Sequence, residues 1–513
     1  MTNRRQFLQA GAFGLGGMLL GGVAWSKPEA IVRTILPSVS SDTIALKVLL
    51  DAPPKAAPLL RIDGRTVHGQ RSDPDGYAWQ FVQKGLKGGT RHELALTDDQ
   101  GTALRAPWSL STLPPADSRP DHYRILFFTC AGGDEAEPDQ HIPMAHRRAL
   151  LDRALSFQPD LAVANGDHVY WDQWTGLKYF GSPAKRAKTA ETQHRIAWLD
   201  EDTQFDSPTN RQSLNTIVGR QIAALYEDRF ASVPLLFISD DHDYFENDDA
   251  GPWGYSFPPR PFILGLQRRT ADMAYPVALG RPSLSGPLAN ETVETVRIGK
   301  LIEMAMFDCR RGWSTGPEAR VLFPEVERFL IERLRQSDAQ QYIHVPSNPF
   351  GWSKGALGEW YEDKPRGVSG YSDKDYWQAG WFAQHQRLAQ ALSAQRGRAA
   401  ISISGDMHAC AATRMTRSGD IDLSANPIEA ILCGPVGTGK DGYPSAARGN
   451  LPFHPAKVEA TDRVPFEERN GFTLFDVYPD RIDVRQFRWR EPEPVEAIAT
   501  LQPSHSFTIN RPA

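Results

Sequence analysis

An alternation of apolar and polar residues runs through the first hundred residues of the chain. The side chains of Ile44, Leu46 and Val48 fall on one face of an extended backbone, which is the period-two pattern of a half-buried strand. Similar stretches at 77–82 and 92–96 follow, with turns rich in Asp and Gly between them. Several short strands at this spacing predict a small all-β sandwich of the immunoglobulin or fibronectin kind.

A proline-rich stretch ends this β domain. Residues 114–120 contain three prolines, and such a stretch forms a stiff linker between domains. We therefore expect a β domain over 27–113, a second domain over 121–490 and a C-terminal tail over 491–513.

Beyond the linker, continuous apolar runs alternate with stretches of helical periodicity. We expect buried strands at 125–128, 161–164, 235–238, 301–307, 399–403, 430–433, 472–477 and 482–487, and helices at 144–157 and 376–395. This alternation predicts an α/β domain with a large buried sheet. The polar or Pro/Gly-rich segments 173–210 and 245–295 predict loops near the functional site.

The N-terminal segment 1–26 has the features of an export signal. Arg4 and Arg5 precede Phe7-Leu8 and a Gly-rich apolar run that is too short for a comfortable membrane span. This pattern resembles a twin-arginine (Tat) signal, with an ordinary Sec signal or an uncleaved anchor as the alternative. We expect the Tat machinery as a partner, a periplasmic or secreted location and no transmembrane domain in the mature protein.

Charge and cysteine content narrow the possible functions. The 513 residues carry a formal net charge of −5, which argues against specific binding of nucleic acid. Four cysteines are too few for a disulfide scaffold. Folding in a reducing compartment, before Tat export, is consistent with that number.

Chemically distinctive residues stand at the ends of four predicted strands. The list is Cys130 after the first strand, Asp167, His168 and Tyr170 after the second, Asp240 to Asp243 after the third, and Asp406 and His408 after the strand near 400. Each motif alone has an ordinary explanation as a turn, a solvated acidic loop or a buried thiol. Because carboxyl ends of strands converge on one crevice, and clustered carboxylates repel one another without a cation, the four together predict a metal site.

These motifs resemble those of the PhoD-like (alkaline phosphatase D) metallophosphatases of the calcineurin-like metallophosphoesterase superfamily. The resemblance covers about residues 120–490 and rests on Gly-Asp-x-x-Tyr, Asp-Asp-His-acid with a later Asn, and Gly-Asp-x-His. The match includes Asp308-Cys309-Arg310 and Asp375-Tyr376-Trp377. It implies a β-sandwich flanked by helices. The chain departs from the family where Ala131-Gly132-Gly133 follows the cysteine and where the acid after the histidine is Asp243.

The resemblance also implies roles for individual residues. Asp167 would bridge two metal ions, with Cys130 and Tyr170 on iron. Asp406 and His408 would complete the ligation, and Asp241 and Asn247 would hold the second ion. The resemblance implies that this second ion is calcium. His242 is the candidate proton donor to the leaving oxygen. The remaining sequence candidates are His141 and His168, for which we expect either roles that support the metal ligands without touching the metal or purely structural roles.

The donor chemistry favours the same metals. Thiolate and phenolate suit an acidic ion such as Fe(III), whereas carboxylate and amide oxygens suit Ca(II); a pair of Zn, Mn or other divalent ions is the alternative. Two ions would clamp a phosphate while a metal-bound hydroxide attacks phosphorus. Arg310 would bind a phosphate oxygen or, equally well, pair with Asp308 or another carboxylate.

Two functions follow from these expectations. The first is an exported phosphatase or phosphodiesterase that hydrolyses phosphate esters, with monoesters and diesters both open. The alternative is a non-catalytic, calcium-stabilised extracytoplasmic binding protein. The thiol and the histidine favour the enzyme, because a purely structural calcium site needs neither.

Overall fold

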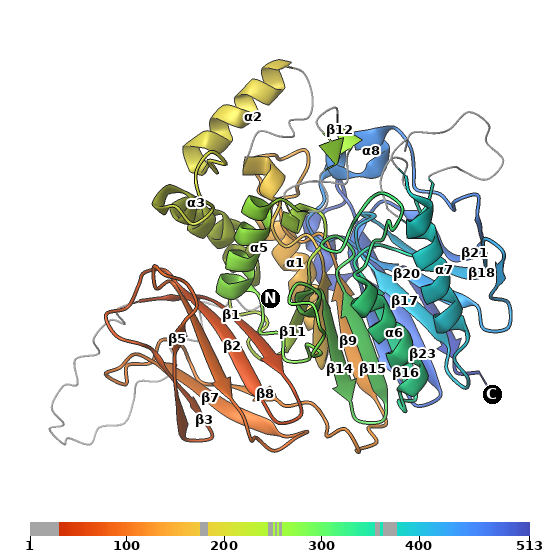
Figure 1. Cartoon of the computed structure of the whole chain (residues 1–513). Coiled ribbons are helices and arrows are strands. Elements are labelled where there is room, and N and C mark those ends of the chain that lie inside the picture. The colour runs from red at the N-terminus through yellow and green to blue at the C-terminus, as the bar shows by residue number, and fades with distance from the viewer. Residues whose placement is uncertain are drawn as a thin grey trace, which may run out of the picture.

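The computed structural model describes residues 30–174, 183–244, 250–251, 254–255, 259–353, 360–362 and 377–512. An N-terminal β domain packs beside a larger α/β domain (Figure 1). The predicted signal, 1–26, and the predicted ligand Asn247 lie outside the described residues. Within the described ranges, no helix combines the length and the apolar character needed to cross a membrane.

The N-terminal domain consists of two four-stranded sheets, in the orders β1-β2-β6-β5 and β4-β3-β7-β8. The strands are β1 (Val32–Val39), β2 (Ile44–Leu50), β3 (Leu59–Ile62), β4 (Arg65–His68), β5 (Gln70–Arg71), β6 (Ala78–Gln83), β7 (Arg91–Thr97) and β8 (Trp108–Ser111). Leu46 and Val48 of the first sheet share an apolar cluster with Leu60 and Leu96 of the second. The antiparallel sheets confirm the predicted small all-β domain.

Two larger sheets form the second domain. The first has the order β11-β10-β9-β22-β23-β24, and the second β14-β15-β16-β17-β20-β18-β19, with β21 paired to β18. Their strands are β9 (Tyr123–Phe128), β10 (Leu161–Asn165), β11 (Leu235–Ile238), β14 (Val293–Ile298), β15 (Ile302–Phe307), β16 (Gln341–Pro346), β17 (Ala400–Ser404), β18 (Cys410–Ser418), β19 (Ile421–Asp422), β20 (Ile428–Cys433), β21 (Val458–Glu467), β22 (Asn470–Val477), β23 (Arg481–Trp489) and β24 (His505–Asn510).

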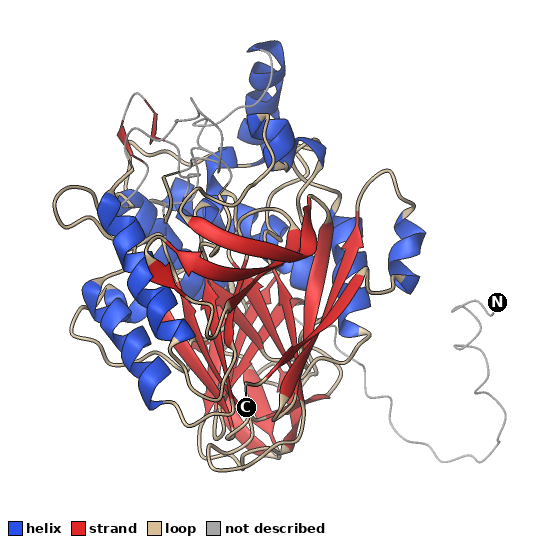
Figure 2. Cartoon of the chain, turned by 90° about the vertical axis from the view of Figure 1, so that its right-hand side faces the viewer, coloured by secondary structure: helices blue, strands red, loops and turns tan. Residues whose placement is uncertain are grey.

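The inner faces of the two sheets share one apolar core, and helices cover the outer faces. Phe127 and Phe475 of the first sheet lie in the same buried cluster as Met304 and Ile403 of the second. The covering helices include α1 (Met144–Leu155), α6 (Pro324–Gln336) and α7 (Ala379–Ser393), and Figure 2 shows helices flanking the strands. The predicted α/β sandwich flanked by helices is confirmed.

The segments predicted as loops hold helices instead. Helices α2 (Pro183–Ile196) and α5 (Pro261–Ala274) lie within these segments, and α3 (Pro208–Val218) begins at the end of the first; α4 (Ala224–Tyr226) and a short α8 (Pro444–Arg448) lie elsewhere in the chain. Prolines that suggested loops open helices here, because proline at the first helical position needs no backbone N–H. A two-strand hairpin, β12 (Ala250–Gly251) and β13 (Gly254–Tyr255), also lies in this region.

The predicted C-terminal tail also contains regular structure. Strand β24 pairs with β23 over six residue pairs, from Arg481↔Asn510 to Gln486↔His505. The second domain therefore extends past residue 490 and takes in most of the segment expected to be a tail. Alternate β24 residues are exposed, and the strand lies at the edge of the sheet. Its sequence therefore has only a weak pattern of apolar residues from which a strand could be predicted.

Parallel strands in both sheets end at the same edge of the sandwich. In the first sheet β9, β10 and β11 are parallel, and in the second β15, β16, β17 and β20 are parallel. An isolated bridge between Thr129 and Pro435 joins the strand ends of the two sheets. Residues that follow these strands therefore gather in one place, as the sequence predicts.

Candidate metal centre

Four residues of the candidate site have a left-handed backbone conformation. Their φ angles are 47° at Cys130, 59° at Asp167, 66° at Asp406 and 50° at His408. Residues other than glycine rarely adopt this conformation, and such strain is concentrated at functional sites. Each lies just past the carboxyl end of β9, β10 or β17, so the sharp turn leaves the strand direction and aims the side chain across the sheet edge.

Glycines allow the strand ends to approach closely. Gly166 has a φ of 81°, and a Cβ atom there would overlap the Cβ of Asp240. At Gly405, a Cβ would overlap the Thr129 hydroxyl and the carbonyl of Asn165. The Gly-Asp pairs of the two motifs therefore combine close backbone packing with a projecting carboxylate.

The described side chains form three overlapping groups of metal-ligand type. They are Cys130, Asp167 and His408; Asp167, Asp241 and His242; and Asp240, Asp241 and Asp406. Within each group the candidate ligand atoms lie within 4.8 Å of one another. The three groups share members, so they make up one continuous centre.

Tyr170 joins the first of these groups. Its hydroxyl donates to Oδ2 of Asp167 at 3.0 Å and lies 3.4 Å from Nε2 of His408. We call Cys130, Tyr170 and His408 the thiol half, and Asp240, Asp241 and Asp406 the carboxylate half. Asp167 lies between them.

Asp406 and His408, which the resemblance names as completing the ligation, belong to different ligand groups. His408 groups with Cys130 and Asp167, whereas Asp406 groups with Asp240 and Asp241. The two residues are only two positions apart, and successive left-handed turns send them to opposite halves of the centre. His408 is further fixed by a contact of Nδ1 with the carbonyl of Gly442 at 2.6 Å.

Burial raises the pKa of most acids in the centre. The pKa values of the Cys130 thiol and the Tyr170 phenol are raised, first by burial and then by the negative charge of Asp167. Burial, followed by repulsion from Asp241, raises the pKa of Asp167. The raised pKa of each group favours its protonated form in the absence of a cation. A bound cation takes the place of those protons.

Unpartnered buried oxygens support the same conclusion. Oδ1 of Asp167 and Oδ2 of Asp240 are buried, and neither has a hydrogen-bond partner in the described part of the chain. Buried carboxylate oxygens without a partner are costly. The residues present therefore fit bound cations, which would satisfy both oxygens.

Arg310 binds carboxylates of the centre. Its Nε lies 2.5 Å from Oδ1 of Asp240, and an Nη lies 3.4 Å from Oδ1 of Asp406. Its side chain is 1% exposed. Asp308 contacts the same loop through its Oδ1, which accepts from the backbone N–H of Arg310 at 2.6 Å. Of the two sequence interpretations, the geometry corresponds to the ion pair, formed with Asp240 and Asp406.

His242 is held by a partner that sequence reasoning missed. Its Nδ1 lies 3.0 Å from Oδ1 of Asp172, and its ring stacks on Tyr170 at 4.0 Å between centroids. Burial alone lowers the pKa of His242, but Asp172, Asp241 and Asp167 outweigh it and raise that pKa to about 10. The imidazole is therefore fixed in orientation and favoured in its protonated form.

Asp243 and His168 have structural positions. The Asp243 carboxylate accepts the backbone N–H groups of Asp167, His168, Val169 and Asp240 at 2.9–3.1 Å. The His168 ring stacks on Phe237 at 3.7 Å, and its Nε2 contacts the carbonyl of Ile238. His141 lies closer to the centre, with its ring edge on Tyr170 at 4.7 Å.

Sequence reasoning also missed Asp240 as a ligand candidate, although it named the neighbouring Asp241. They lie two and three residues after the end of β11, and adjacency was the available signal. The short helices η1 (Trp171–Trp174) and η3 (His242–Tyr244), which carry Asp172 and His242, pack against each other. No local pattern in the sequence indicates that contact.

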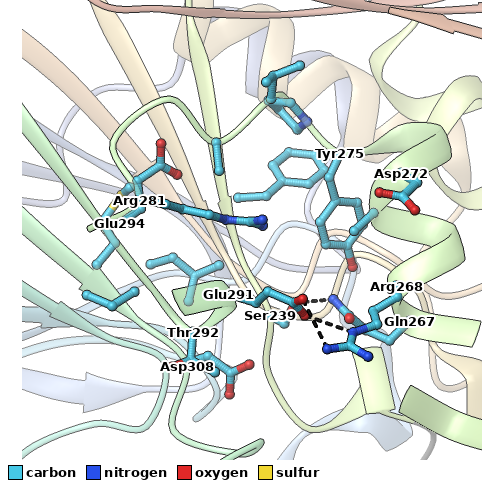
Figure 3. A pocket seen from close by; sticks show the side chains of 18 of the residues that line it. Ser239, Gln267, Arg268, Asp272, Tyr275, Arg281, Glu291, Thr292, Glu294 and Asp308 are labelled. Atoms are coloured by element: carbon cyan, nitrogen blue, oxygen red, sulfur yellow. Dashed lines mark hydrogen bonds and ion pairs between the residues drawn. The ribbon is translucent and has the colours of Figure 1, made fainter. Parts of the chain in front are cut away.

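A separate cavity of about 300 Å³ lies between the two domains. Ser239 and Asp308 line it beside Arg281 and Glu294 (Figure 3). None of the residues of the three ligand groups lines this cavity. The chemistry of the centre therefore lies outside it, although Ser239 directly precedes Asp240.

Comparison with solved structures identifies the fold. A structure described as that of PhoD superposes with a TM-score of 0.59 at 14% sequence identity, covering 93% of this chain and 90% of that chain. The chain has the PhoD fold. This agrees with the resemblance in the motifs, and the coverage shows that the PhoD fold extends over both domains.

A second solved structure has a related fold. The purple acid phosphatase PPD1 from yellow lupin (Lupinus luteus) seeds superposes with a TM-score of 0.55 at 13% identity, covering 94% of this chain and 75% of that chain. No family model matches the sequence. No curated protein matches it either. The likeness is therefore one of fold, and the chemistry rests on the residues of the centre.

Proposed function

We propose that the protein is a metal-dependent phosphoric ester hydrolase with two cations at the centre. One observation carries this proposal: Asp167 belongs to two ligand groups at once, between a thiol half and a carboxylate half. A carboxylate shared by two cation sites is the arrangement required of a two-metal clamp on phosphate. The PhoD fold and the purple acid phosphatase fold support the assignment.

The donor sets favour two unlike cations. Cys130, Tyr170, His408 and Asp167 would hold Fe(III), because deprotonated thiol and phenol are strong donors to an acidic ion. The carboxylate half, with Asp167, would hold Ca(II) through oxygen ligands alone. When bound, the cations supply Lewis acidity to the phosphate oxygens and activate water for attack on phosphorus. A pair of Zn or Mn ions is the alternative.

The protein's own residues bind and orient the reacting groups. His242, fixed through Nδ1 by Asp172, donates a proton from Nε2 to the departing oxygen of the ester. Arg310 holds Asp240 and Asp406 in position against their mutual repulsion. Asp243 orients the loops that carry Asp167 and Asp240 through their backbone N–H groups.

We further propose PhoD-like specificity and export through the Tat pathway to the periplasm or the cell exterior. The twin arginines of the first 26 residues support the route. All four cysteines are free and buried, which is consistent with folding in a reducing compartment before export. A fusion of residues 1–26 to a reporter should be exported, and replacing Arg4 and Arg5 by Lys should keep it inside the cell.

The activity is tested with the full-length protein. Elemental analysis of the purified protein should find iron and calcium, and the protein should hydrolyse nitrophenyl phosphate, its bis ester or both. Chelator treatment should abolish turnover, and addition of the two ions should restore it. Calcium alone with no turnover on either substrate would contradict the proposal and favour the calcium-stabilised binding protein.

A further inference from the structure

A π-turn interrupts the helix behind the thiol half. Helix α3 (Pro208–Val218) continues through η2 (Gly219–Ala223), a turn of π-helix, into α4. A π-turn fits one extra residue into the helix, which rotates the side chains that follow it and is frequently found at functional sites. Here it presents two successive residues, Arg220 and Gln221, to the loops of the metal centre.

Gln221 joins the two loops that carry the thiol half. Its side-chain Oε1 accepts the backbone N–H of Tyr170 at 2.9 Å and the backbone N–H of Gly133 at 2.7 Å. Gly133 lies three residues after Cys130. The side-chain nitrogen of Gln221 donates to Gln173 at 3.3 Å, and the residue is fully buried. One amide oxygen therefore fixes the distance between the loop of Cys130 and the loop of Tyr170.

Neighbouring residues add further contacts between the π-turn and the loop of Cys130. Arg220 binds Asp134 in a fork, with Nε at 2.6 Å from Oδ2 and Nη2 at 2.9 Å from Oδ1. Asp134 directly follows Gly133, so the π-turn holds the Cys130 loop at two consecutive positions. On the outer side, Arg33 of the β domain donates to the carbonyl of Gly219 at 3.0 Å.

We propose that Gln221 is a positioning residue of the metal centre, which sets the Tyr170 phenol relative to the Cys130 thiol. This inference rests on the proposed function, since it assumes that both residues bind one cation. Residues that orient metal ligands without touching the metal control affinity and ligand geometry. A structural role alone would stabilise the fold but leave the metal's spectrum and release rate unchanged.

The chain offers a closely matched control. Gln384 of α7 is also buried, and its Oε1 accepts the backbone N–H groups of Val321 and Leu322, each at 2.8 Å. Gln221→Met and Gln384→Met both remove an amide that bridges two N–H groups while keeping the side-chain volume. Gln221→Glu keeps the accepting oxygen and serves as the conservative rescue.

The experiment compares these variants with the wild-type protein after loading with Fe(III). The measured quantities are the phenolate-to-iron absorption band, the rate of iron loss to a chelator and the melting temperature. We expect Gln221→Met to shift the band and to release iron roughly 10–100-fold faster, with Gln221→Glu close to wild type. Gln384→Met should lower the melting temperature with no effect on band or release.

The possible results separate the positioning role of Gln221 from the proposed function of the protein. If the band and the release rate of Gln221→Met equal those of Gln384→Met, the positioning role is overturned and the proposed function stands. If wild type neither holds iron nor hydrolyses the ester substrates, the proposed function fails, and this inference fails with it. If Gln221→Met does not fold, Gln221→Asn, which shortens the side chain that bridges the two N–H groups, is measured in its place: a band and release rate unlike wild type support the positioning role, and equality with wild type overturns it.

Discussion

The two halves of the metal centre differ in their donors and in what holds them. The thiol half presents sulfur, phenol and imidazole, and backbone hydrogen bonds to an uncharged amide, Gln221, position two of its loops. The carboxylate half presents oxygens only, and the buried cation Arg310 holds it. The two halves therefore offer unlike sets of donors, one held by an uncharged amide and the other by a buried positive charge.

The largest effect is expected where the halves meet. Asp167→Asn should reduce the content of both metals and lower turnover on the order of a thousandfold. Loss of one group that stabilises charge in the transition state has an effect of this size. Elemental analysis and ester hydrolysis measure this. Asp160→Asn, at the opposite end of β10, is the control and should leave both unchanged. Loss of only one metal in Asp167→Asn would mean that the halves do not share this residue.

A smaller effect should separate the halves. Cys130→Ser should weaken iron binding while calcium binding persists. Removing a residue that only orients a metal ligand costs roughly 10–100-fold in affinity. The loss here should be larger, because Cys130 is a proposed ligand itself. Metal titrations of the variant, with each ion alone, measure both affinities. Equal loss of calcium would contradict the separation of the two sites.

The carboxylate half can be probed through its buried cation. Arg310→Gln leaves Asp240 and Asp406 without their compensating charge, and removing one partner of such a buried pair costs about 3–5 kcal/mol. Added calcium should recover part of this loss, since it supplies the missing positive charge. Chemical unfolding with and without calcium tests this prediction, and an equal loss in both conditions would count against a cation site there.

The smallest effect is expected at Asp172. Asp172→Asn removes the carboxylate that orients His242, and we expect turnover to fall by roughly tenfold to a hundredfold, because a positioned general acid contributes about 10²–10⁴-fold in all and the imidazole itself remains. The content of both metals should stay at the wild-type level. Kinetics and elemental analysis on the same preparation measure the two. A loss of metal in this variant would make His242 a ligand rather than a proton donor.

The sequence predicted the parts of the molecule that depend on local pattern. Buried strands such as β9 and β11 are continuous apolar runs, and the polar residue after each run marks the strand end. This placed Cys130, Asp167 and Asp241 correctly at one sheet edge, because carboxyl ends of parallel strands converge. The β domain was predicted for the same reason, from its alternating pattern.

Features that depend on contacts distant in sequence were not predictable. Asp406 and His408 reach different halves through left-handed turns that no residue type signals. Asp172 contacts His242, and Gln221 contacts Tyr170, in each case 50 or more positions away in the sequence. Helix α5 and strand β24 were missed because the first begins at a proline and the second buries few side chains.

We propose that unlike cations occupy the two halves and share Asp167. Anomalous diffraction from crystals of the metal-loaded protein, recorded at and below the iron edge, distinguishes the two ions. We expect one iron bound by Cys130 and Tyr170 and a second, lighter ion among the carboxylates, about 3.5–4 Å away. Two identical ions, or iron away from Cys130, would contradict it.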